Sequence, residues 1–151
     1  MYNYCKEVND IRKKSFPEIK GAIWIIKIPF PIPGASVLWI LPNLNLLAFS
    51  TKCKILSRDV LRGLIAHELS HFSTFQKGSW KGFWKFVFIA TKEEAVKMEK
   101  ATDRLAIKKG YGKELIATKK KAKQILTGTR WEHYLDNYLT EDEVRKYMKK
   151  E

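Results

Sequence analysis

The sequence predicts an α+β fold in which a small three-stranded sheet packs against several helices. Three apolar segments between Ile19 and Thr51 are rich in β-branched and aromatic residues, and proline, glycine and asparagine separate them. The segments that follow repeat their apolar residues at helical spacing instead. The chain has 151 residues and 45% hydrophobic content, which suits a single domain with a packed core.

The first fifty residues predict one short helix and three strands. Residues 5–14 favour a helix that ends before Pro17. The strands then read IKGAIWIIKI, ASVLWIL and NLLAFST. A proline-rich break ending at Gly34 separates the first strand from the second, and Pro42-Asn43 separates the second from the third.

Residues 58–76 are predicted to form a long helix that faces the core. Ser57 is a suitable N-cap, Asp59 lies in the first turn, and Gly78 is a suitable stop. An apolar stripe at helical spacing runs along the segment: Leu61, Ile65, Leu69 and Phe72.

This helix contains His67-Glu68-Leu69-Ser70-His71, the most informative pattern in the chain. Residues four apart lie on one helix face, so both imidazoles can reach a single metal ion. Glu68 lies beside them, where it can transfer protons rather than bind the metal. The H-E-x-x-H arrangement is typical of zinc-dependent hydrolases. The competing interpretation makes His67 and His71 hydrogen-bonded core histidines.

A third metal ligand is expected on the next helix, because catalytic zinc usually takes three protein ligands and leaves one position for water. That helix is predicted at 92–109, with Thr91 and Glu94 in a capping-box pattern and Gly110 after its end.

Glu99 and Asp103 lie one turn apart on this helix. Glu99 is the candidate ligand, and Asp103 is the candidate acceptor of a hydrogen bond from a ligating histidine. Alternatively both carboxylates belong to a solvated face, because charged residues surround them.

The remaining segments predict a helix at 111–126 and a final short helix after Thr140, with Glu143 completing a capping box. The tail 129–151 supplies candidates for stabilising an oxyanion: Arg130, His133, Tyr134 and Tyr138. His133 has the most suitable chemistry, and Tyr134 lies beside it. The alternative for His133 is an ordinary surface histidine.

Residues 78–90, GSWKGFWKFVFIA, mix aromatic residues with lysines. Two interpretations stay open: residues 80–90 touch a membrane surface, or the aromatics form a loop that caps the small core.

The net charge of +13 calls for an explanation. Basic proteins often bind nucleic acid or anionic membranes, yet the lysines are spread along the chain and no nucleic-acid motif accompanies them. A lysine- and isoleucine-rich composition is also typical of thermophilic proteins, which we favour over a nucleic-acid partner. The longest apolar stretches are shorter than the ~20 residues that span a bilayer, so we expect a soluble, cytoplasmic protein.

The motifs LRGLIAHELSHF and EKATDRLAIKKGYGKEL together resemble the gluzincin metallopeptidases of the HtpX-like and CAAX-prenyl endopeptidase branch. The chain is most similar to the small soluble archaeal minigluzincins, over about residues 20–125. The second motif of this branch commonly has alanine before the aspartate, where this chain has Thr102.

This resemblance implies a minimal gluzincin fold with a catalytic core at about residues 20–126. It implies an endopeptidase with one zinc ion per chain, bound by His67, His71 and Glu99, in which Glu68 is the general base and then the general acid.

The resemblance also makes the third strand an edge strand to which extended peptides add by backbone pairing, through Leu46, Leu47, Ala48 and Phe49. It further implies a latent zymogen, in which the tail 129–151 blocks the cleft. The alternative function is a catalytically silent zinc-binding module that acts on nucleic acid or a membrane surface through its basic charge.

Overall fold

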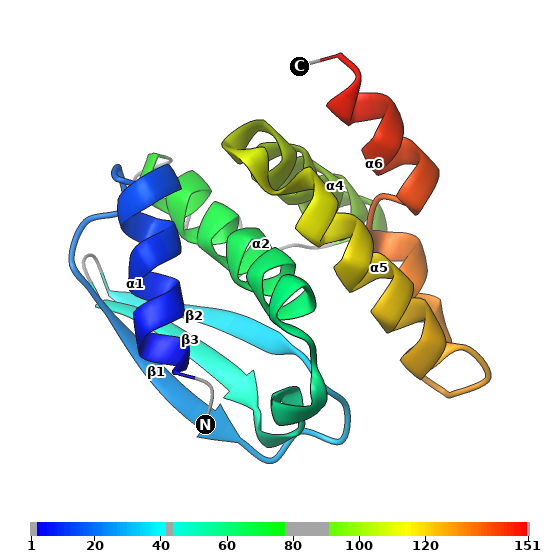
Figure 1. The fold of residues 1–151 in the computed structure, drawn as a ribbon, viewed down its shortest axis with the longest axis horizontal. Helices are drawn as coiled ribbons and strands as arrows, with labels where there is room; N and C mark the ends of the chain where they lie inside the picture. Colours follow the sequence, from blue (N-terminus) through cyan, green and yellow to red (C-terminus); the bar gives the residue numbers. More distant parts are fainter. Residues whose placement is uncertain (1–2, 42–43, 78–90, 151) are drawn as a thin grey trace.

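The structure is a computed structural model that describes residues 3–41, 44–77 and 91–150. It has the predicted α+β architecture, with a three-stranded sheet and helices (Figure 1). Three short helical turns, η1, η2 and η3, accompany the regular elements. The elements in chain order are α1 (Tyr4–Ser15), β1 (Ala22–Ile28), β2 (Ala35–Leu41), β3 (Leu44–Ser50), η1 (Thr51–Ile55), α2 (Arg58–Lys77), α4 (Lys92–Ala106), η2 (Ile107–Tyr111), α5 (Gly112–Leu126), η3 (Glu132–Asn137) and α6 (Glu141–Met148).

Helix α2 lies in the middle of the molecule. Figure 1 shows α1 and the sheet on one side of it and the helices α4, α5 and α6 on the other. The predicted apolar stripe of α2 is buried, and it forms the main core together with α1 and the inner face of the sheet. That core includes Val8, Ile11, Leu47, Phe49, Leu61, Ile65, Leu69 and Phe72.

The sheet has the strand order β1-β3-β2, with β1 parallel and β2 antiparallel to β3. The prediction that Leu46–Thr51 forms an edge strand is therefore wrong. Leu46, Leu47, Ala48 and Phe49 lie in the central strand, where both neighbours use the backbone groups that an incoming peptide would need. The strand at the edge beside the long helix is β2, which contacts α2.

The ends of the helices follow the chemistry of their capping residues. Thr91 accepts a hydrogen bond from the backbone N–H of Glu94, and Thr140 forms the predicted capping box with Glu143. Helix α4 ends at Ala106, three residues before the predicted end. The chain then makes a π-helical turn, in which Gly110 adopts a φ of 92°, before α5 begins.

The aromatic segment at 78–90 lies outside the described residues, so neither interpretation of it is tested. None of the described helices combines the length and the apolar character that crossing a bilayer requires.

Helices α2 and α5 approach each other closely at Gly63. A Cβ atom at this position would lie 2.3 Å from both Glu114 O and Thr118 Oγ1. The Thr118 hydroxyl also reaches across to the backbone of α2, where it lies 3.0 Å from Val60 O. The absence of a side chain at Gly63 thus allows the contact that aligns α5 along α2.

We expect Gly63→Ala to lower the free energy of unfolding by about 1–3 kcal/mol, because the helices must move apart to admit the methyl group. Urea denaturation followed by circular dichroism measures this change. Gly34→Ala is the matched control, since nothing lies within 4 Å of its Cβ position. If the two variants are equally stable, the close packing of α2 against α5 at Gly63 is contradicted.

Candidate metal centre

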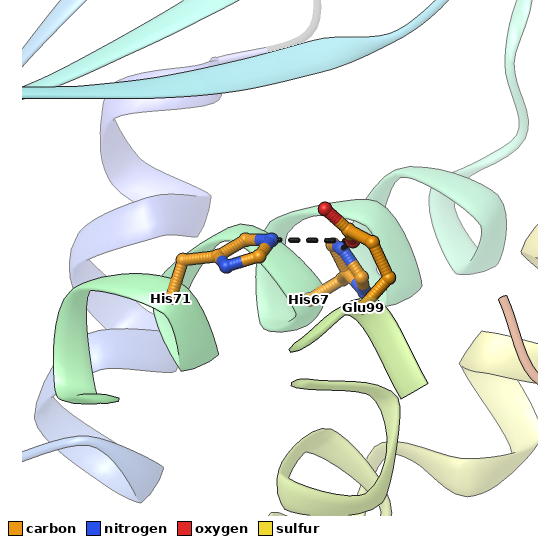
Figure 2. Close-up of side chains that lie close together, drawn as sticks. All are labelled: His67, His71 and Glu99. Atoms are coloured by element: carbon orange, nitrogen blue, oxygen red, sulfur yellow. Dashed lines mark hydrogen bonds and ion pairs between the residues drawn. The ribbon is translucent and has the colours of Figure 1, made fainter. Parts of the chain in front are cut away.

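Three side chains from two helices converge on one point between α2 and α4. His67 and His71 come from α2, and Glu99 comes from α4 (Figure 2). Glu99 Oε2 lies 3.0 Å from His67 Nε2 and 3.4 Å from His71 Nε2. The two histidines are buried and the carboxylate is half-buried, so this group is held within the protein.

The spacing of these three donor atoms suits a metal ion. All three lie within 4.8 Å of one another. Ligands about 2.1 Å from a tetrahedral zinc ion are about 3.4 Å apart, which is close to the two separations from Glu99 Oε2. The donor set of two nitrogens and one oxygen also fits zinc. These residues can therefore hold a metal ion after a small movement of the side chains.

The other nitrogen of each histidine is bound by a residue of α4. His67 Nδ1–H donates to Asp103 Oδ1 at 2.8 Å. His71 Nδ1 lies 3.3 Å from Thr102 Oγ1, and this hydroxyl donates its own proton to Met98 O at 2.9 Å. Thr102 must then accept from Nδ1–H, which leaves Nε2 of His71 as the atom that can bind a metal.

Thr102 is a site residue that the sequence analysis missed. In the sequence this position stands out only as a departure from the alanine usual in the resembling family. The signal was its spacing, because Thr102 directly precedes Asp103 on the same helix, and a hydroxyl there can reach the second histidine.

Asp103 is fully buried, with 0% of its side chain exposed. The interpretation of this residue as part of a solvated face is therefore wrong. Besides His67, its carboxylate receives two donors at Oδ2: the Lys119 ammonium at 2.7 Å and the backbone N–H of Leu139 at 2.9 Å. It thus joins four segments of the chain, namely α2, α4, α5 and the tail.

Lys119 is the second site residue that the sequence pattern does not identify, because it stands in a run of three lysines, Lys119-Lys120-Lys121. It lies four residues after Leu115 and seven before Leu126, both buried, and so shares their helix face. A lysine at an apolar position of an amphipathic helix was the available signal.

The electrostatics of the centre favour a bound cation. Burial would lower the pKa of His67, but its hydrogen bonds with Asp103 and Glu99 raise it to about 9. Burial would likewise raise the pKa of Glu99, but hydrogen bonds from the two histidines hold it below its usual range. The proton that these carboxylates retain on His67 is the one that a metal ion would displace.

Glu68 is buried beside the two histidines, and its burial raises the pKa of its carboxyl group. Asp103 and Glu99 differ from Glu68 in this respect, because the pKa values of both carboxyl groups lie below their usual range. The environment therefore separates one carboxyl group that can exchange a proton from two that stay ionised.

The tail brings Tyr138 to the centre rather than the two residues favoured from sequence. The Tyr138 ring contacts His67 edge-on, with ring centroids 5.5 Å apart, and Lys119 lies 4.3 Å from the centre of the same ring. His133 and Tyr134 are both exposed, contact each other with tilted rings whose centroids lie 4.3 Å apart, and lie outside the converging group.

Comparisons of the chain with protein-family models, curated proteins and solved structures found no match.

We expect Thr102→Val to weaken zinc binding about tenfold, because valine keeps the shape of threonine but cannot hold the Nδ1 proton of His71. Competition with a chromogenic chelator measures the affinity. Thr74→Val is the matched control, since the exposed Thr74 makes the same hydroxyl bond to the carbonyl four residues earlier, that of Ser70. Similar losses in both variants would show that only helix stability is affected.

Proposed function

We propose that this protein is a zinc-dependent endopeptidase, the activity that its resemblance to gluzincins implies, with one zinc ion bound by His67, His71 and Glu99. The observation that carries the proposal is the orientation of both imidazoles. Their Nε2 atoms face one oxygen of Glu99, while their Nδ1 atoms are held by Asp103 and Thr102. Two histidines and a glutamate are a ligand set of catalytic zinc, in which the fourth position stays open.

A zinc ion in this position supplies a Lewis acid that polarises the scissile carbonyl and makes water acidic. The residues of the chain provide the proton transfers. Glu68 accepts a proton from the attacking water and delivers it to the leaving amine, for which its raised pKa is suited. Asp103 keeps His67 in the tautomer that presents Nε2.

The strand that pairs with an extended peptide in this proposal is β2. It is an edge strand of the described sheet and contacts the helix that carries both histidines. A peptide that adds to β2 would run past the metal centre with its own backbone bonded to the sheet. This assignment replaces the one made for Leu46–Phe49.

A latent form of the enzyme is a second candidate, and the position of Tyr138 supports it. This side chain comes from the tail and lies against a proposed metal ligand, where a substrate carbonyl would need room. The backbone of the next residue, Leu139, donates to Asp103, so the same segment also supports the centre. Deleting the whole tail would therefore mix two effects, release of the cleft and loss of a ligand's support.

We expect the purified protein to bind one zinc ion per chain and His71→Ala to lose it. Glu68→Gln should retain zinc and the fold while turnover of a peptide library falls by about 10²–10⁴-fold, because only proton transfer is removed. Metal analysis, circular dichroism and peptide digestion give the three readings. If the wild type binds zinc through His71, and neither the wild type nor the Tyr138→Ala variant cleaves any peptide, the result would indicate the silent zinc-binding module instead.

We expect Tyr138→Ala to raise peptidase activity at unchanged zinc content, because it removes the ring beside His67 but keeps the Leu139 N–H in place. Tyr134→Ala is the matched control, since that ring is exposed and contacts His133 rather than His67. Steady-state hydrolysis of the best peptide gives the comparison. Lower activity in Tyr138→Ala, with zinc retained, would assign Tyr138 a role in catalysis and end the case for latency.

A further inference from the structure

The charged residues of the segment that forms the sheet are all basic. Between Glu18 and Asp59 the chain contains no acidic residue, and its basic residues are Lys20, Lys27, Lys52, Lys54 and Arg58. All five are exposed. The rest of the chain mixes both signs of charge, whereas no acidic side chain of this segment offsets its basic residues. This part of the surface would attract an anionic partner.

The same segment exposes large apolar side chains on one face of β1. Trp24 is 62% exposed and Ile26 is 38% exposed, whereas Ile23 and Ile25 pack against the core. Alternate residues of a strand point to opposite faces. Trp24 and Ile26 therefore stand on the face of the sheet turned away from α1 and α2, which lie together on the other face (Figure 1).

Two further exposed apolar residues lie at the carboxyl end of β1. Phe30 is 43% exposed, and Ile55, in η1, is 63% exposed. Hydrogen bonds hold η1 and the residues after β1 together: Ser50 Oγ donates to Phe30 O at 3.3 Å, and Lys52 Nζ donates to Pro31 O at 2.6 Å. We refer to Trp24, Ile26, Phe30 and Ile55 with Lys20, Lys52 and Lys54 as the sheet surface. Lys27 is not part of it, because its ammonium lies 5.2 Å from the ring centre of Tyr4 in α1.

We propose that the sheet surface binds an anionic phospholipid membrane. A tryptophan and a phenylalanine with aliphatic neighbours and flanking lysines fit the boundary between headgroups and acyl chains, where apolar side chains insert and ammonium groups meet lipid phosphates. The described helices do not span a bilayer, so the protein would lie on the membrane. This proposal does not depend on the metal centre.

Two other occupants fit the observations less well. Single-stranded nucleic acid would use Trp24 and Phe30 for base stacking, but Ile26 and Ile55 have no aromatic face to offer. A second copy of the chain would bring two basic surfaces together without an acidic residue of the same segment to offset them.

Flotation with vesicles tests the proposal. The wild type should float with vesicles of equal parts phosphatidylglycerol and phosphatidylcholine, and should stay behind with phosphatidylcholine alone. Trp24→Ala should lower the apparent partition coefficient about tenfold, because it removes an inserting side chain. Lys54→Gln should lower it about fivefold, and added salt should lower it further.

The matched controls are Tyr134→Ala, an exposed aromatic residue of η3, and Lys113→Gln, an exposed lysine of α5. Neither should change the partition coefficient, and circular dichroism checks that all four variants fold.

Failure of the wild type to bind anionic vesicles at low salt would overturn the proposal, as would equal losses in test and control variants. A single-stranded oligonucleotide that binds through Trp24 in place of vesicles would overturn it in favour of nucleic acid. A dimer that dissociates in Trp24→Ala, with no vesicle binding, would assign the surface to self-association.

Discussion

The buried carboxylate of Asp103 is the constraint on which the arrangement of the C-terminal half depends. A charge without solvent is costly unless it is paired and hydrogen-bonded, and Asp103 is compensated by His67, Lys119 and the backbone of Leu139. These partners come from α2, α5 and the tail, so no element can move independently without leaving a buried charge unpaired. The geometry that a metal ion would need is therefore maintained by the packing of the helices.

The candidate metal centre and the tail are coupled through this network. Leu139 N–H binds the same carboxylate that orients His67, and the adjacent Tyr138 lies against the His67 ring. The segment that could restrict access to the proposed site thus also supports one of its ligands. In the proposed enzyme, Tyr138 would then control access to the site, and the backbone of its neighbour Leu139 would support metal retention.

Helix α2 keeps the two proposed activities apart. Its apolar stripe packs against α1 and the inner face of the sheet, whereas its histidines face α4. Trp24 and Ile26 of the sheet surface lie on the far face of the same sheet. A protein held on a membrane through the sheet surface would therefore keep the helices of the metal centre on the side away from the lipid, beyond α2 (Figure 1).

The sequence alone determined the features that depend on local spacing. The helix and strand segments, the pattern at residues 67–71, the cap at Thr140 and the pairing of Glu99 with Asp103 all follow from the periods of helices and strands and from capping chemistry. Only the tertiary structure decided what depends on long-range contact. The parallel pairing of β1 with β3 places β3 in the centre of the sheet, although its sequence also suits an edge strand. The packing of α5 and the tail against α4 brings Lys119 and Tyr138 to the centre and leaves His133 exposed. The identity of a charged residue and of its neighbours along the chain does not predict its distant ion-pair partner, because that pairing forms only when the helices pack.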